Sequence, residues 1–171
     1  MEPKFYEHGE QGPWKISGQN KKILNTLNDL IRINIDRITA YEKASHEEMT
    51  PEPEIREVFY RLGTDSRAYV NILHAEVIRL GGAPVTNSTI SGKIYMHWLD
   101  GKNSFEGPDT PGRLNACIAA EMAIQKAYEQ ALSEQNVLPE RIYQLVENQL
   151  WAFERAHQQL VSLQERHNSI T

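Results

Sequence analysis

The feature that most constrains the fold of this chain is a pair of segments that each occur twice. The stretch INIDRITAYEKA, residues 33–44, aligns at an offset of 87 with AEMAIQKAYEQA, residues 120–131, and both contain AYExA. A second pair, SRAYVNIL at residues 66–73 and ERAHQQLV at residues 154–161, aligns at an offset of 88. Two nearly equal offsets predict an internal duplication. The alternative is chance similarity between amphipathic helices, which share composition.

Each copy is predicted to hold two helices, because apolar residues recur in it with helical spacing. The expected helices span about residues 21–45, 51–80, 110–135 and 139–167. The connection between the second and third helices, residues 81–112, is rich in Gly, Pro, Ser and Thr, and no segment has the pattern of a strand. The sequence therefore predicts an all-α fold, an antiparallel four-helix bundle of two duplicated hairpins joined by a long crossover.

One domain with an N-terminal extension is expected from the length of 171 residues. Residues 1–20 are polar and rich in glycine, which predicts an irregular arm, and Trp14 and Phe5 are expected to anchor it to the body. Residues 21–171 are expected to form the bundle.

The composition excludes several classes of function. A net charge of −5 argues against a general binder of nucleic acid or of anionic membranes, since both need a basic surface. No apolar run approaches the ~20 residues that span a membrane, and the N-terminal stretch lacks the apolar core of a signal peptide. The single cysteine, Cys117, excludes an intrachain disulfide and fits a reducing compartment. We therefore expect a cytoplasmic protein with no nucleic-acid and no membrane partner.

Three residues of the second copy are candidate metal ligands. Glu121 lies on an apolar row of its helix, and Glu154 and His157 belong to a stripe with Leu150 and Val161 at spacings of four, three and four. We expect all three candidates to face the core, where carboxylates need a partner. Two carboxylates and an imidazole can bind one divalent metal. In the alternative, the Glu and the His of the stripe only hydrogen-bond tyrosines inside the bundle.

The matching positions of the first copy hold different side chains. Asn34, Ser66 and Tyr69 stand where the repeat places the counterparts of the three candidates. An amide, a hydroxyl and a phenol are neutral at pH 7 and are poor ligands for a second metal ion. The sequence therefore predicts that any metal at this place is a single ion.

These features resemble the ferritin-like superfamily, which includes ferritins, bacterioferritins and rubrerythrins. In those proteins each of two hairpins supplies one Glu and one Glu-x-x-His, and the six ligands bind two irons. The three candidates match one ligand set, and the first copy departs from the pattern at all three positions. The stretches at residues 27–44, 62–84 and 138–163 are also similar to a bacterial ferritin-like family of unknown function. The resemblance favours iron as the metal, with zinc or manganese as alternatives, and implies a homodimer.

Two functions follow from this sequence. The first is a ferritin-like protein of unsettled activity that binds one metal ion, iron before others, through the retained ligand set. The second is a metal-free, stress-related scaffold or interaction protein whose metal site has decayed. Both functions are compatible with an enzyme and with a protein that has no catalytic activity.

Overall fold

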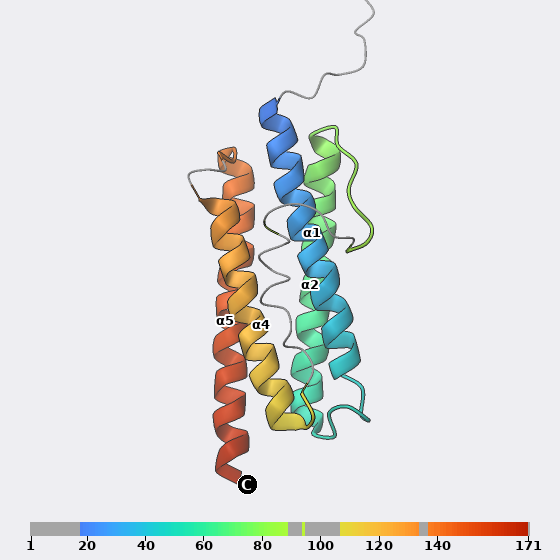
Figure 1. The fold of residues 1–171 in the computed structure, drawn as a ribbon, viewed down its shortest axis with the longest axis vertical. Helices are drawn as coiled ribbons and strands as arrows, with labels where there is room; N and C mark the ends of the chain where they lie inside the picture. Colours follow the sequence, from blue (N-terminus) through green and yellow to red (C-terminus); the bar gives the residue numbers. More distant parts are fainter. Residues whose placement is uncertain (1–17, 89–93, 95–106, 134–136, 171) are drawn as a thin grey trace, which may run out of the picture.

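The computed structural model describes residues 18–88, 94, 107–133 and 137–170, and these form four long helices with no strand among them (Figure 1). The helices are α1 (Gly18–Ala44), α2 (Pro53–Arg79), α4 (Thr110–Leu132) and α5 (Glu140–Ile170). The predicted all-α bundle is confirmed. Each helix in these ranges is too short or too polar to cross a lipid bilayer.

The four helices form two antiparallel hairpins that lie side by side. Figure 1 shows α1 packed against α2 and α4 against α5, with all four axes running along the length of the bundle. The long crossover connects α2 to α4, as the sequence predicts, and Ile94 within it is buried against the core. Residues 1–17 of the predicted arm lie outside the described residues, whereas residues 18–20 already belong to α1.

Local sequence signals explain where two of the helices end or begin. α2 ends at Arg79, and two residues later Gly81 has a φ of 77°, in the left-handed region that glycine adopts without a steric cost. The amide of Gly81 donates to the carbonyl of Ile78 at 2.9 Å. α4 starts after Asp109, whose Oδ1 accepts a hydrogen bond from the amide of Gly112 at 2.8 Å.

The interior contains two apolar clusters with buried polar residues between them. One cluster is built around Leu27, Leu30, Ile31, Leu73 and Val77, and the other around Phe59, Leu62, Leu114 and Leu160. Asn34 and Arg37 on α1, Ser66 on α2 and Glu121 on α4 are all buried near the level where one cluster gives way to the other. Buried charged residues are rare unless paired, so this level is where a functional site is sought first.

Candidate functional site: a buried arginine–glutamate network

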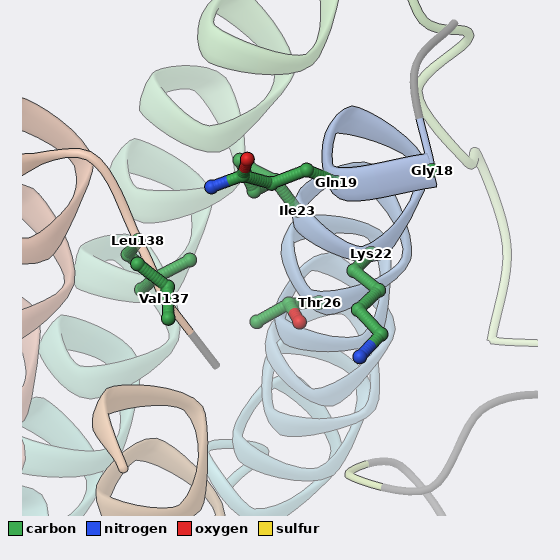
Figure 2. Close-up of a pocket in the computed structure, with 7 residues that line it drawn as sticks. All are labelled: Gly18, Gln19, Lys22, Ile23, Thr26, Val137 and Leu138. Carbon is green, nitrogen blue, oxygen red and sulfur yellow. The ribbon is translucent and has the colours of Figure 1, made fainter. Parts of the chain in front are cut away.

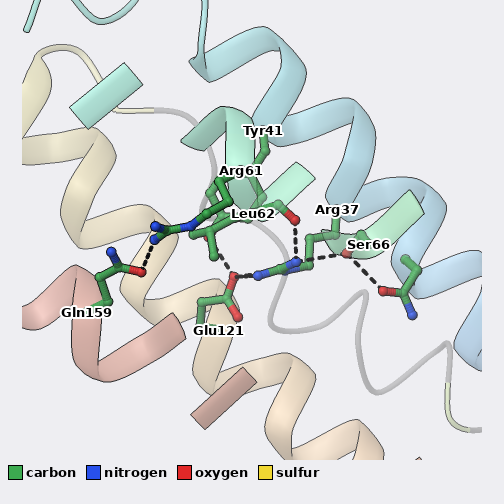
Figure 3. A network of polar contacts seen from close by, with 8 residues as sticks. Arg37, Tyr41, Arg61, Leu62, Ser66, Glu121 and Gln159 are labelled. Carbon is green, nitrogen blue, oxygen red and sulfur yellow. Dashed lines mark hydrogen bonds and ion pairs between the residues drawn. The ribbon is translucent and has the colours of Figure 1, made fainter. Parts of the chain in front are cut away.

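Glu121 is fully buried at 0% exposure, and one of its carboxylate oxygens is the centre of a polar network. Glu121 Oε1 accepts a hydrogen bond from the hydroxyl of Tyr41 at 2.6 Å and another from Nε of Arg37 at 2.9 Å. Nη2 of Arg37 lies 2.8 Å from the same oxygen (Figure 3). The negative charge of Glu121 is therefore neutralised by a cation of the chain itself.

The guanidinium of Arg37 is held on its other side by α2. Nη1 donates to the carbonyl of Leu62 at 2.7 Å and to Oγ of Ser66 at 2.8 Å (Figure 3). The Cζ atom also lies 4.9 Å from the ring centroid of Tyr41 and 4.9 Å from that of Phe153. The guanidinium of Arg37 therefore contacts residues of all four helices. These are Tyr41 on α1, Leu62 and Ser66 on α2, Glu121 on α4 and Phe153 on α5.

The environment keeps both hydrogen-bond donors to Glu121 in their usual protonation states. Burial alone would lower the pKa of the Arg37 guanidinium, but the neighbouring Glu121 carboxylate raises it above its ordinary value. Burial, followed by the charge of Glu121, raises the pKa of Tyr41 well above its ordinary value of 10.0. At neutral pH Arg37 is thus positively charged and the phenol of Tyr41 is neutral.

A chain of hydrogen bonds continues from Arg37 toward the other end of the bundle. Ser66 Oγ, which accepts from Arg37, donates to Oδ1 of Asn34 at 2.9 Å. Nδ2 of Asn34 donates to the hydroxyl of Tyr128 at 2.8 Å, and this hydroxyl donates to Oε1 of Gln149 at 2.7 Å. Each hydroxyl or amide accepts from one neighbour and donates to the next, so the donor directions are consistent from Arg37 to Gln149.

Two of these contacts are reciprocal between the hairpins. Tyr41 of the first hairpin bonds Glu121 of the second, and Tyr128 of the second bonds Asn34 of the first. Adding 87 to the numbers of Asn34 and Tyr41 gives Glu121 and Tyr128. The same offset separates the starts of α2 at position 53 and α5 at position 140.

Two buried polar atoms of this network have no hydrogen-bond partner among the residues that the structure describes. They are Oε2 of Glu121 and Nε2 of Gln149. Such atoms are uncommon in native interiors, because each gives up hydration without compensation. The free oxygen of Glu121 is the one feature of the centre that would suit an additional cation or hydrogen-bond donor.

The structure does not bring the three predicted metal ligands together. Glu121 is buried as expected, but Glu154 is exposed and His157 is only half-buried. Across the residues that the structure describes, no group of three or more His, Cys, Asp or Glu side chains is placed to hold a metal ion. The structure therefore does not bring Glu121, Glu154 and His157 together, and metal binding by these three residues stays a prediction.

The reason is the rotation of α5. The stripe of residues 150, 154, 157 and 161 continues by three to Gln164, and Gln164 donates a hydrogen bond to Oδ1 of exposed Asn115 on α4. The stripe thus follows the outer edge where α4 and α5 meet, and the residues of α5 that enter the core are one position away, such as Phe153 and Leu160, both at 0% exposure. One residue corresponds to a rotation of about 100° in a helix.

The offset of 88 between the second pair of segments is also too large by one residue. It matches buried Ser66 with exposed Glu154, whereas an offset of 87 matches Ser66 with buried Phe153 and half-buried Tyr69 with buried Ala156. The pattern of burial therefore fits a single offset of 87. The Arg-Ala dipeptide that both segments contain favours an offset of 88, which is one residue larger than the offset that fits the burial.

Sequence reasoning also missed Arg37, the central residue of the network. Its spacing of three from Asn34 and four to Tyr41 places it on the same inward row of α1. That spacing was the available signal, but an arginine is normally assigned to the surface.

A hollow of about 420 Å³ lies at the start of α1 and is separate from this network. It is lined by Gly18, Gln19, Lys22, Ile23, Thr26, Val137 and Leu138 (Figure 2). Its walls are mostly apolar, and it contains none of the candidate residues. It lies about three helical turns of α1 from Arg37.

Comparison with known proteins places the chain in a family. Residues 22–134 match the model of a domain of unknown function, DUF2383. The chain belongs to this family. No curated protein matches the sequence. A solved structure titled as ferritin-like, diiron-carboxylate proteins from Bacillus anthracis str. Ames superposes with a TM-score of 0.68 at 16% identity, over 86% of this chain and 99% of that chain.

The structural match confirms the ferritin-like fold. At this level of identity it shows the fold alone, and fold does not determine function. What this member of the DUF2383 family does must be argued from its own core, where an arginine neutralises the buried carboxylate.

Proposed function

We propose that this protein is a metal-free ferritin-like bundle that acts as a scaffold or interaction protein. The observation that supports the proposal is the contact between Arg37 and Glu121. Two guanidinium nitrogens and the Tyr41 hydroxyl all lie within hydrogen-bond distance of one carboxylate oxygen. The carboxylate expected to bind a metal already has its positive partner, and this partner is part of the chain.

The side chains around Glu121 do not fit a di-iron centre. Di-iron bundles use four carboxylates and two imidazoles, which balance the charge of the metals. Here the centre holds one carboxylate, one guanidinium, and the neutral groups of Tyr41, Ser66 and Asn34. A metal ion beside Glu121 would lie within a few ångströms of the positive Arg37, and in a buried place that repulsion is poorly screened.

One observation favours the second candidate function, binding of a single metal ion. Oε2 of Glu121 is buried and has no hydrogen-bond partner within the described part of the chain, so it retains capacity for a cation. For the predicted ligand set to form, Glu154 and His157 would have to turn inward from the edge between α4 and α5. Iron is the metal that the ferritin-like resemblance favours, and this ligand set stays a prediction.

A metal titration decides between the two candidates. The protein is purified without chelator or metal-affinity resin, its metal content is measured by elemental analysis, and Fe²⁺ under anaerobic conditions, Mn²⁺ and Zn²⁺ are then titrated. We expect far less than one equivalent per chain and no change in the unfolding temperature. One equivalent that disappears in both Glu121→Gln and His157→Ala, but persists in Asp36→Ala, which removes a half-buried carboxylate outside the predicted ligand set, would establish the metal site and overturn the proposal.

Four further parts of the proposal concern the whole chain. We propose that the two hairpins arose by duplication, and the reciprocal bonds of Tyr41 with Glu121 and of Tyr128 with Asn34 support it. We also propose a cytoplasmic homodimer without a nucleic-acid partner. Light scattering coupled to gel filtration tests the dimer, since a mass of 19.6 kDa would mean a monomer.

A further inference from the structure

The atoms around Arg37 have the composition of a binding site for a planar cation. All four polar contacts of the guanidinium go to oxygen acceptors, which are Oε1 of Glu121, the carbonyl of Leu62 and Oγ of Ser66, at 2.7 to 2.9 Å. These three acceptors come from two helices, α2 and α4, that are on different hairpins. Arg37 itself, at 1% exposure, comes from a third helix.

Two aromatic rings add a shape requirement to these acceptors. The rings of Tyr41 and Phe153 each have their centroid 4.9 Å from Cζ of Arg37. A guanidinium is flat, weakly hydrated and stacks on aromatic faces, whereas an ammonium or a metal ion is compact and strongly hydrated. The surroundings therefore select for a guanidinium by charge, by the direction of its N–H groups and by its flat shape.

We infer that this core is a guanidinium-binding site that the chain fills with its own Arg37. The inference rests on the proposed metal-free function and extends it, because it names the cation for which the site is built. It follows that a chain without the side chain at position 37 takes up a free guanidinium from solution in preference to a metal ion or an ammonium. The acceptors on Glu121, Leu62 and Ser66 stay in place after the substitution, and Glu121 then lacks its counter-ion, so binding relieves a buried, unpaired charge.

The test uses Arg37→Ala and methylguanidinium at millimolar concentrations, far below those at which guanidinium salts denature proteins. Thermal unfolding is followed with methylguanidinium, methylammonium, sodium or Mn²⁺, each as the chloride. We expect methylguanidinium to raise the unfolding temperature of Arg37→Ala in a saturable way toward that of the wild type, and the other three cations to have little effect. Wild type, Arg37→Ala/Glu121→Gln, and Arg67→Ala, which removes an exposed arginine of α2, should not respond.

A second variant keeps the inference testable if Arg37→Ala does not fold. Arg37→Lys keeps the charge but loses the flat fork of N–H groups, so its unfolding temperature should fall well below that of the wild type. An Arg37→Lys protein as stable as the wild type would overturn the inference. An equal response of Arg37→Ala to methylammonium, uptake of Mn²⁺ by this variant, or no response to methylguanidinium would each do the same. The proposed metal-free function is judged separately, by the titration of the wild type.

Discussion

Arg37→Met should be one of the most damaging single substitutions in this protein. Methionine fits the apolar part of the arginine stem, so the change removes the charge with little loss of packing. Among the described residues it leaves Glu121, at 0% exposure, with the Tyr41 hydroxyl as its one remaining hydrogen-bond donor. Removing one partner of a buried ion pair costs about 3–5 kcal/mol, and domains are stable by only about 5–15 kcal/mol. A large fraction of the stability should therefore be lost.

The companion variants separate the charge from the rest of the contact. In Arg37→Met/Glu121→Gln both charges are gone, and the amide oxygen of the new glutamine can still accept from Tyr41. Replacing a buried ion pair by neutral groups is often close to neutral for stability. We therefore expect the double variant to be more stable than Arg37→Met alone by about 2 kcal/mol or more. The costs of the two single substitutions are then not additive, as is typical of residues in one network.

Urea unfolding of the wild type, both single variants and the double variant measures this coupling. The slope of free energy against urea should be the same in all four proteins, so that the midpoints compare native-state stabilities. A cost below about 1 kcal/mol for Arg37→Met, in the range of ordinary substitutions, would refute the reasoning. Additive single costs in the double variant would show that Arg37 and Glu121 do not interact as described.

Three other changes test the remaining assignments. Glu154→Ala should change the free energy of unfolding in urea by less than about 0.5 kcal/mol, because Glu154 is exposed, and a larger loss would indicate a role in the core. Alkaline pH should destabilise the wild type, because burial and the charge of Glu121 raise the pKa of Tyr41. The neutral phenol contributes its full stabilisation below the unfolded pKa of about 10. That contribution is lost as the pH rises through the higher folded pKa. Urea midpoints measured across that range should fall less steeply in Tyr41→Phe, and an equal fall would remove Tyr41 as the cause. Gly81→Ala should cost about 1 kcal/mol, since a side chain at a φ of 77° is strained, and an unchanged midpoint would contradict this end of α2.

The fold could be predicted because its signals are long and redundant. Each helix repeats its apolar spacing over several turns, so an error at one position does not alter the assignment. The duplicated AYExA segments and the long crossover then restrict the topology to two hairpins. The burial of Glu121 was predicted correctly for the same reason, since its row on α4 is apolar over several turns.

The partners of Glu121 could not be predicted because they depend on single positions. An offset of 88 instead of 87 corresponds to a rotation of α5 by about 100°. It places Glu154 in the core, whereas the structure has Phe153 buried there and Glu154 exposed. The residue type of Arg37 gave no reason to place it in the core, because a lone arginine is almost always exposed. It is buried here because Glu121, 84 residues away in the sequence, pairs with it, and a long-range pair of this kind leaves no periodic signal.

The buried ion pair raises the question of what it contributes beyond stability, since a well-packed apolar pair can be equally stable. In di-iron bundles the metals bind residues of all four helices and so fix how the helices are placed against one another. Arg37 has the same reach, because its guanidinium contacts residues of α1, α2, α4 and α5. We therefore predict that Arg37→Met/Glu121→Leu keeps a stability within about 2 kcal/mol of the wild type but loses the unique packing of the two hairpins. Its amide NMR spectrum should show broadened or doubled signals for residues near position 37, while far-UV circular dichroism stays helical. A spectrum as sharp as that of the wild type would mean that the apolar clusters alone set the register of the hairpins.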